Sequence, residues 1–368
     1  MNLDADLLCC FFDAANMHRW NDHLRPIELT ELDKQSHKVA IAWMLGKFEE
    51  SSGYKVKWKN IIEYSMFSFI QRLILTDLKP NLFHRIKAER SKELNDYVIS
   101  EFERLVPNCC KELKTRFVKY LRGERNTKED RIIRAAHYLA TYWEFRLIKD
   151  LNSSMYAIRE TEKDIENELA VHKDLHGVSE IMLSRSFGLV DMFGQLRFQQ
   201  RWARTPRVPK TTVLGHMLLV ADMVYLNDLD KGTSDDKAYK NYFKALFHDL
   251  PEVLTKDVIS PVKNNVGGLN ELLEDYEREL VESKIIPLIP KDWHNEFREL
   301  IYDPFSGDGY DIKTCDLLAA YMEADMSIRY GIGSAKLKRS RDDIKATLLS
   351  RKGIDTERLI KRFNEIDV

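Results

Sequence analysis

Helix breakers are scarce throughout this chain, and this scarcity constrains its fold more than any other feature. Only 15 glycines and 10 prolines are spread over 368 residues. Leucine, alanine, lysine, glutamate and arginine are plentiful, and long stretches run without either breaker. Such a composition favours helices over strands. The sequence therefore predicts an all-α protein, folded as one large domain or as two of ordinary size.

Charge and hydropathy argue against several classes of partner. The 57 basic and 59 acidic side chains nearly cancel and leave a net charge of −2. The chain therefore lacks the overall positive charge that attracts nucleic acid or an anionic membrane surface. No apolar segment reaches the length of about 18 residues that a membrane-spanning helix needs, and the start of the chain lacks the layout of a signal peptide. We expect a cytoplasmic protein without a nucleic-acid or membrane partner.

A histidine and an aspartate stand side by side in an apolar run of the second half. A helix predicted at about 238–254 carries His248 and Asp249. Glu252 follows four residues after the histidine, so all three side chains can point into one pocket. Charged groups among apolar neighbours are costly to bury unless a cation or hydrogen bonds compensate them. A bound metal ion is the simplest explanation.

Two further polar residues interrupt apolar helices. His216 lies on a helix predicted at about 211–227, and Asp316 lies on one predicted at about 311–329. Either residue alone is more typical of a hydrogen-bonded core group than of a ligand. Together with His248 and Asp249 they bring imidazole and carboxylate groups from three helices. Such a set suits a divalent ion with open positions for water.

The order of these four residues resembles that of the HD-domain phosphohydrolases, whose ligands are a histidine, a His-Asp dipeptide and an aspartate. The string 248–257, with 261–263 after it and Arg201-Trp202 ahead of His216, is similar to the bacterial 5'-deoxynucleotidases. The resemblance covers roughly residues 180–350. It implies a bundle of helices that binds one divalent ion, and it implies relatives that pair as dimers.

The resemblance also implies a role for each further residue of the site. Glu252 would hold the attacking water or carry its proton rather than bind the metal. The Arg201 guanidinium offers a fork for phosphate oxygens, and the Trp202 ring offers a rigid plane for the sugar or base. In the deoxynucleotidase branch the residue matching Asp257 lies near the sugar. Lys263 is a weaker candidate for binding the phosphate.

Two properties of the site stay open at this point. A set of two histidines and two aspartates accepts manganese, cobalt, iron, zinc, nickel or magnesium. The loop ahead of His216 also carries Arg204, Arg207 and Lys210, which would suit a substrate with more than one phosphate. The sequence chooses neither the metal nor the number of phosphates.

Landmarks of the second half recur in the first half. Arg19-Trp20 matches Arg201-Trp202. Three more landmarks recur at a constant spacing of 179 positions, namely His37 and His216 (216 − 37), Thr76 and Thr255 (255 − 76), and His137 and Asp316 (316 − 137). A constant spacing favours a tandem duplication. The sequence thus predicts two tandem HD-like helical domains, over residues 1–176 and 177–368.

The same spacing predicts what the first copy has lost. Phe69, Ile70 and Leu73 stand where the second copy has the HD pair and the glutamate. We therefore expect residues 1–176 to form a degenerate HD-like domain without a metal site. The alternative is a different metal site made by His37, His84 and His137. A degenerate half could supply the surface that a second subunit supplies elsewhere, so we expect either a monomeric pseudo-dimer or a homodimer.

These expectations together predict an enzyme that acts on nucleotides. The predicted reaction is metal-dependent removal of the 5'-phosphate from (deoxy)nucleoside monophosphates, by attack of a metal-activated water. One alternative is HD-type hydrolysis of nucleoside triphosphates or of a signalling nucleotide. The other is a nucleotide-sensing regulatory protein with little turnover.

Overall fold

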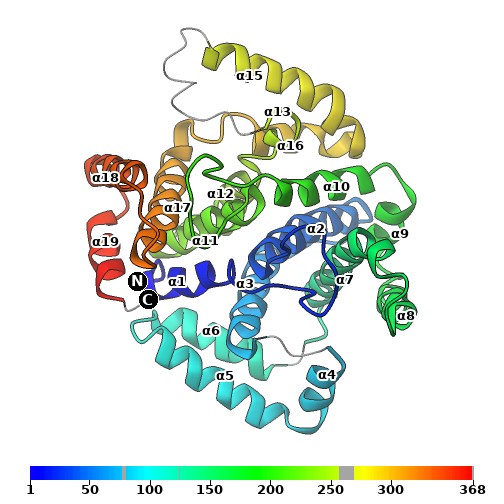
Figure 1. Cartoon of the computed structure of the whole chain (residues 1–368). Helices are drawn as coiled ribbons and strands as arrows, with labels where there is room; N and C mark the ends of the chain where they lie inside the picture. The colour runs from blue at the N-terminus through cyan, green and yellow to red at the C-terminus, as the bar shows by residue number, and fades with distance from the viewer. Residues whose placement is uncertain (77–79, 124, 257–268, 367–368) are drawn as a thin grey trace.

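The computed structural model describes residues 1–76, 80–123, 125–256 and 269–366. Within these ranges the protein is all-α, as predicted. It forms helices and no strand, apart from two isolated bridges, His18–Thr30 and Gln200–Thr212. Figure 1 shows how the helices are arranged. No helix in the described ranges combines the length and the apolar composition that crossing a bilayer requires.

The helices follow one another along the chain, with long loops between α1 and α2 and between α10 and α11. The earlier ones are α1 (Ala5–Asp13), α2 (Glu31–Ser51), α3 (Trp58–Leu75), α4 (Pro80–Glu89), α5 (Ser91–Leu105), α6 (Lys111–Arg122), α7 (Lys128–Ile148) and α8 (Ile158–Ala170). The later ones are α9 (His176–Leu183), α10 (Phe187–Gln195), α11 (Val213–Lys231), α12 (Asp235–Phe247), α13 (Glu252–Thr255), α15 (Leu269–Leu280), α16 (His294–Ile301), α17 (Tyr310–Arg329), α18 (Ala335–Ser350) and α19 (Thr356–Glu365).

Helices α2 and α11 lie side by side at the centre of the molecule (Figure 1). Every residue from Val213 to Asp228 of α11 is buried, as is typical of a helix that is apolar on all sides. Helix α7 packs on α2, and both α12 and α17 pack on α11. Each central helix begins at a capping threonine: Thr30 accepts a hydrogen bond from the backbone of Asp33, and Thr212 accepts one from Gly215.

Two helices that the sequence predicts as continuous are interrupted. The broad apolar face of residues 180–198 predicts one helix. The structure divides it into α9 and α10, because Ser184 is extended and its hydroxyl accepts a hydrogen bond from the backbone N–H of Ser186. The helix expected at about 238–254 ends at Phe247. Pro251 has no N–H to donate to the Phe247 carbonyl, so the helix cannot continue through it. His248 and Asp249 therefore lie in a turn rather than within a helix.

The first and the last described helices, α1 and α19, are in contact. Between them, Arg362 pairs with Asp6 at 2.9 Å. Helix α9 packs on α2, although α9 belongs almost wholly to the second predicted domain. The division into 1–176 and 177–368 stays a prediction.

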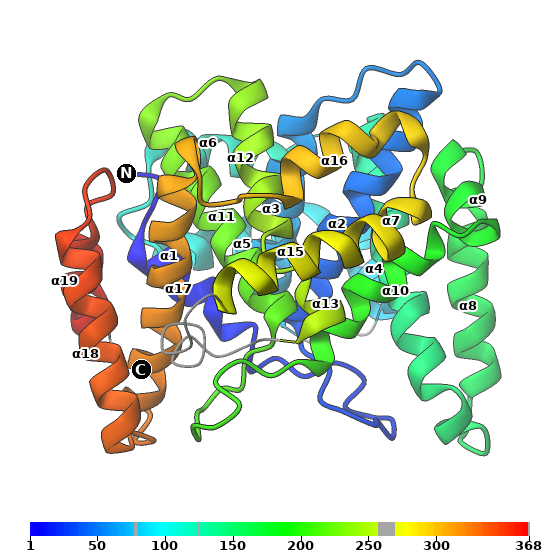
Figure 2. The ribbon, with the colours of Figure 1, turned by 90° about the horizontal axis from the view of Figure 1, so that it is seen from above.

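Local features of the first half recur in the second half. The two bridges and the left-handed residues Trp20 (φ 54°) and Trp202 (φ 57°) are 182 positions apart (200 − 18 and 202 − 20). Figure 2 shows the two loops that contain them, 14–30 in blue and 199–212 in green, on the same side of the molecule. These recurrences support the predicted duplication, which itself stays a prediction.

The structure corrects the predicted match to His216. Lys34 lies four residues after the cap Thr30, and His216 lies four residues after the cap Thr212. Lys34, and not His37, therefore takes the place of His216. The two candidates in the first half are three residues apart and share a helix face, so the apolar pattern of α2 does not separate them.

The structure also corrects the predicted match to His248. The Ser68 hydroxyl donates to the carbonyl of Ser65, and Nδ1 of His248 donates to the carbonyl of Ala245, three residues earlier in each case. Ser68 lies eight positions before Thr76, and His248 lies eight positions before Lys256. Thr76 and Lys256 both have a positive φ, of 54° and 63°. Ser68 therefore replaces Phe69 as the match, and by the same register Arg72 rather than Leu73 stands where Glu252 does.

Candidate metal centre

His216 lies in the first turn of α11 and is completely buried. Its Nε2 is 3.0 Å from Oδ1 of Asp316, and its Nδ1 is 3.5 Å from Oε1 of Glu323. Both carboxylates come from α17, which packs on α11. The packing of these two helices therefore fixes the orientation of the imidazole ring.

His248 follows the last residue of α12 and is buried. Its Nδ1 is 2.7 Å from the carbonyl oxygen of Ala245, which can only accept a hydrogen bond. Nδ1 therefore carries the proton, and Nε2 presents a lone pair. This Nε2 is buried, makes no hydrogen bond to the described residues, and lies 3.1 Å from Oδ2 of Asp249.

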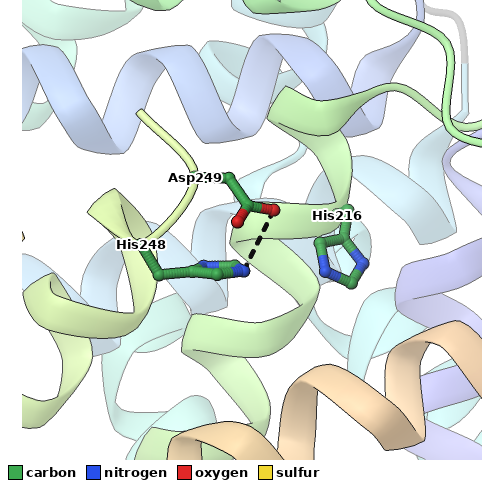
Figure 3. A group of neighbouring side chains, drawn as sticks. All are labelled: His216, His248 and Asp249. Atoms are coloured by element: carbon green, nitrogen blue, oxygen red, sulfur yellow. Dashed lines mark ion pairs between the residues drawn. The ribbon is translucent and has the colours of Figure 1, made fainter. Parts of the chain in front are cut away.

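His216, His248 and Asp249 form one compact group (Figure 3). Each offers a ligand atom within 4.8 Å of the others, and in the described part of the chain no other group of three such side chains is found. The centroids of the two imidazole rings are 5.6 Å apart. Two imidazoles and a carboxylate are ligands that divalent transition metals accept, and the backbone bond of His248 is the kind of support that metal-binding histidines have. The residues present therefore fit a divalent ion.

Asp316, the fourth predicted ligand, borders this group without belonging to it. Its Oδ1 contacts His216, and its Oδ2 is 2.7 Å from Nζ of Lys313. The structure therefore brings together three of the four predicted metal ligands and places the fourth beside one of them.

The charges of the group keep its carboxylates ionised. Burial alone would raise the pKa of Asp249, but the neighbouring His248, His216 and Arg201 outweigh it and lower the pKa to about 2. Burial opposes ionisation of Asp316 as well, and its hydrogen bond with His216 and the charge of Lys313 hold its pKa well below the usual range. Anionic carboxylates are the form that binds a metal ion.

Arg201 and Trp202, which the sequence predicts to contact the substrate, lie at the edge of the group. Arg201 Nη1 is 3.6 Å from Oδ2 of Asp249, and its Nε is 3.2 Å from Oε2 of Glu323. The Trp202 indole donates to the same oxygen of Glu323 at 2.8 Å. These contacts fix the guanidinium plane and the indole ring beside Asp249.

Glu323 organises this edge, and the sequence analysis gave it no role. It is fully buried on α17 and also accepts a hydrogen bond from the Thr211 hydroxyl at 2.8 Å. The charge of Arg201 and the His216 contact overcome the effect of burial and hold its pKa well below the usual range. The sequence contains one sign of its role, namely that another glutamate, Glu144, stands at the corresponding position of the first half.

Glu252 is the first residue of α13, immediately after the turn that carries the HD pair. Its backbone N–H donates to the Asp249 carbonyl at 3.1 Å, and its own carbonyl accepts from Gln199 at 2.8 Å. Its carboxylate is among those that raise the pKa of Arg201 against the effect of burial. The predicted base thus lies close to the predicted phosphate contact. Asp257 and Lys263 lie outside the described residues.

Arg207 does not have the role in binding a second phosphate that the sequence suggested. It is buried, and its guanidinium donates to the carbonyl oxygens of Pro209 and Glu323, at 3.2 Å and 3.1 Å. These hydrogen bonds stabilise the loop 199–212 from its buried side. Arg204 and Lys210 are exposed on the same loop.

The alternative metal site in the first half is not formed by His37. Its Nε2 lies 2.9 Å from the Val190 carbonyl and its Nδ1 lies 3.2 Å from Arg197, so both ring nitrogens are used in hydrogen bonds. His137 instead faces Nζ of Lys34, at 2.9 Å and 3.0 Å from its two nitrogens. The side chain of His84 lies outside the described residues.

Known proteins resemble part of this chain in sequence. A family model described as HD domain matches residues 193–310. A 5'-deoxynucleotidase of Shewanella oneidensis is 27% identical over 165 residues, which are 42% of this chain and 81% of that protein. Another 5'-deoxynucleotidase, from Pasteurella multocida, is 24% identical over 168 residues, 43% of this chain and 82% of its own length.

A solved structure of an HD-domain phosphohydrolase from Listeria innocua is 19% identical, with a TM-score of 0.39, and covers 49% of this chain and 98% of its own. The likeness in sequence, rather than this weak superposition, supports the assignment. The matched region 193–310 contains His216, His248 and Asp249. Residues 193–310 therefore resemble an HD domain, and the 5'-deoxynucleotidases are among the distant relatives of the chain.

Proposed function

We propose that this protein removes the 5'-phosphate from (deoxy)nucleoside monophosphates, with one divalent metal ion bound by His216, His248, Asp249 and Asp316. The observation that carries the proposal is the buried, unpaired Nε2 of His248, which lies 3.1 Å from Asp249 in a group that includes His216. A buried nitrogen without a hydrogen bond is costly, and a metal ion at this point would satisfy it.

Each residue around the ion would have a separate role in hydrolysis. Arg201 is held beside Asp249 and would donate to phosphate oxygens, and Trp202 would pack against the sugar or base. The bound ion would lower the pKa of a water and offset negative charge on the phosphoryl group. Glu252 would orient this water and accept its proton. Asp257 and Lys263 are proposed to contact the sugar and the phosphate.

The first half is proposed to act in place of a second subunit. Its central helix α2 packs along α11, the helix that carries His216. The Thr212 hydroxyl, at the cap of α11, donates to Asp33 of α2 at 2.5 Å. We therefore propose that residues 1–176 support the catalytic half, 177–368, and that the chain works as a pseudo-dimer.

The decisive experiment measures phosphate release from deoxy- and ribonucleoside 5'-monophosphates. Wild type and His248→Ala would be compared with manganese, cobalt, magnesium or a chelator. Release that needs metal and is lost in the variant is the expected result, and the deoxy-to-ribo ratio reports how closely the specificity follows the deoxynucleotidases. Absence of release under every metal would contradict the proposal. Pyrophosphate or triphosphate release from nucleoside triphosphates would indicate a different HD activity instead.

A further inference from the structure

The first turn of α11, which carries His216, begins at Thr212. The Thr212 hydroxyl accepts a hydrogen bond from the backbone N–H of Gly215 at 3.2 Å, and the Thr212 carbonyl accepts one from the N–H of His216 at 3.1 Å. The first N–H groups of a helix have no partner within it, so a capping side chain of this kind fixes where the helix begins. The position of His216 therefore depends on the orientation of the Thr212 hydroxyl.

A carboxyl group of the first half fixes this hydroxyl. Oδ1 of Asp33 accepts a hydrogen bond from the Thr212 hydroxyl at 2.5 Å, and Asp33 is buried. A hydroxyl has one hydrogen to donate and lone pairs with which to accept, so donation to Asp33 leaves the lone pairs available to the Gly215 N–H. Asp33 thus acts on the cap of α11 from α2, the helix that packs along it.

Gly215 leaves the space that Asp33 occupies. A Cβ atom added at Gly215 would lie 2.8 Å from Oδ1 of Asp33 and 3.0 Å from the Leu32 side chain, which is closer than packed side chains normally come. Any side chain at position 215 would therefore displace Asp33 or α2. The two halves are thus in close contact at the residue next to His216.

Asp33 and Gly215 occupy equivalent positions of the two predicted copies. They are 182 positions apart (215 − 33), as are the capping residues Thr30 and Thr212 (212 − 30). Near the axis of a symmetric pair of identical subunits, a residue faces its own copy. Two aspartates here would bury two carboxyl groups together, and two glycines would leave the Thr212 hydroxyl without its acceptor. The contact therefore requires two different halves.

We infer that Asp33 of the first half is a positioning residue for the metal centre, and that it holds His216 in place through the cap of α11. The inference deepens the proposed function, on which it rests in taking His216 as a metal ligand. A metal site needs its ligands held within about 0.5 Å of the binding geometry. Asp33 is not a member of the metal group, and its Oδ1 is bonded to Thr212. This role does not require a metal site in the first half.

The test measures the manganese affinity of the full chain by competition with a chelator, in the absence of substrate. Asp33→Ala removes the acceptor and should raise the dissociation constant about tenfold, as is typical when a group that orients a metal ligand is removed. Asp33→Asn keeps a side-chain oxygen for the Thr212 hydroxyl and should bind manganese as wild type does. Thr212→Val removes the hydroxyl itself and should weaken binding as much as Asp33→Ala does.

A double-mutant cycle shows whether Asp33 acts through Thr212. Once Thr212→Val has removed the hydroxyl, Asp33→Ala should cause no further loss of manganese affinity. Losses that add in the double variant would overturn the inference, as would wild-type affinity in Asp33→Ala. If Asp33→Ala does not fold, Asp33→Leu, which is close to aspartate in shape and offers no acceptor, takes its place.

Tyr225→Phe is the matched control, because it removes another buried hydrogen bond between α11 and the first half. The Tyr225 hydroxyl donates to Oε1 of Glu63, on α3, at 2.8 Å. Tyr225 lies nine residues after His216 (225 − 216), which is about 13 Å along the helix. The variant should lose stability toward urea, as Asp33→Ala does, but keep wild-type manganese affinity. An equal loss of affinity would mean that any weakened contact between the halves has this effect, and it would overturn the inference.

Hydrogen exchange provides a measurement that needs no metal. In the metal-free chain, Asp33→Ala should speed exchange at the backbone amides of Gly215 and His216, and Tyr225→Phe should not. Unchanged exchange at these amides in Asp33→Ala would contradict the inference.

Failure of this inference can be told apart from failure of the proposed function. A chain whose manganese affinity depends on Asp33, but which releases no phosphate from any nucleotide, would contradict the proposed function alone. A chain that hydrolyses nucleotides, and whose manganese affinity is unchanged by Asp33→Ala, would contradict this inference alone.

Discussion

Glu144 and Glu323 hold the two arginine-tryptophan pairs of this protein in the same way. Glu144 accepts the Trp20 indole N–H at 2.9 Å and pairs with Arg19, and Glu323 accepts the Trp202 indole N–H at 2.8 Å and pairs with Arg201. Both carboxylates are completely buried. Their other neighbours differ. Glu144 also pairs with Arg197 at 2.6 Å, whereas Glu323 accepts the Thr211 hydroxyl and lies 3.5 Å from Nδ1 of His216.

This difference predicts that Glu323→Gln weakens metal binding and Glu144→Gln does not. A carboxylate beside the second nitrogen of a metal-binding histidine raises the basicity of the ring, and its loss typically costs about 10- to 100-fold in affinity. Each substitution also leaves a buried arginine with less compensation, so each should lower the free energy of unfolding by about 3 kcal/mol. Metal affinity would be measured by competition with a chelator, and stability by denaturant unfolding.

Glu144→Gln serves as the matched control because it removes the same kind of ion pair. Both variants should lose stability to a similar extent, but only Glu323→Gln should lose metal affinity. Equal metal affinity in the two variants would show that Glu323 does not act through His216.

The HD pair should be essential for both metal content and hydrolysis. His248→Ala removes the unpaired Nε2, and Asp249→Ala removes the carboxylate 3.1 Å from it. Each variant, purified with excess manganese, should contain well under one metal ion per chain and release no phosphate above background. Metal content is measured by elemental analysis. Retained activity in either variant would refute the assigned centre.

His137→Ala is the control for this pair. His137 contacts Lys34 rather than the metal group, so the variant should keep one ion per chain. A fall in its metal content would support a second site in the first half.

Much of this site could be predicted from sequence, because its chemistry is concentrated in a few unusual residues. Histidines and carboxylates in apolar helices are costly to bury without a partner, so His216, His248 and Asp249 were visible as a group. The structure brings these three side chains together. The all-α class followed equally directly from the scarcity of breakers.

The register between the halves was harder to predict for a physical reason. A shift of three residues along a helix returns nearly to the same face, so His37 and Lys34 fit the pattern of α2 almost equally well. Only the capping threonines decide between them. Glu323 was missed because the sequence does not show which distant side chains donate hydrogen bonds to a buried carboxylate. The break at Ser184 depends on a local hydroxyl bond that propensity does not reveal.

Glu252→Gln should slow hydrolysis without removing the metal. The glutamate begins α13, just after the HD pair, and its charge acts on Arg201. Loss of a general base typically reduces kcat by about 10²-fold or more. Phosphate release and elemental analysis on one preparation would separate the two effects. A variant that loses its metal, or one with wild-type kcat, would contradict this role.

A buried acid distant in sequence from the HD pair should make stability depend on pH. Asp222 of α11 is buried and accepts a hydrogen bond from the Tyr242 hydroxyl at 3.2 Å. Burial raises its pKa from 3.8 to about 7, against the opposing effects of Tyr242 and of Lys38. Burial also lowers the pKa of the Lys38 amine from 10.5 to about 7. Both groups therefore change charge in the folded protein near neutral pH.

The sign of the Asp222 effect follows from proton linkage. Between about pH 4 and pH 7 the folded state keeps the proton on Asp222 and the unfolded state has lost it, so stability falls as the pH rises through this window. The Lys38 contribution runs the other way, since the unfolded state binds more protons between about pH 7 and pH 10.5. The two effects fall in different pH ranges, and the effect in the lower pH range is that of Asp222.

We therefore expect Asp222→Asn to flatten the stability profile below pH 7. The amide keeps an acceptor for Tyr242 but cannot ionise, so the loss of stability between pH 5 and pH 7 should shrink by about 2 kcal/mol relative to wild type. Urea unfolding at both pH values measures the difference. Asp236→Asn, which changes an exposed aspartate of α12, should retain the wild-type dependence. If Asp222→Asn loses as much stability between these pH values as wild type does, Asp222 is ionised in the fold and the linkage argument fails.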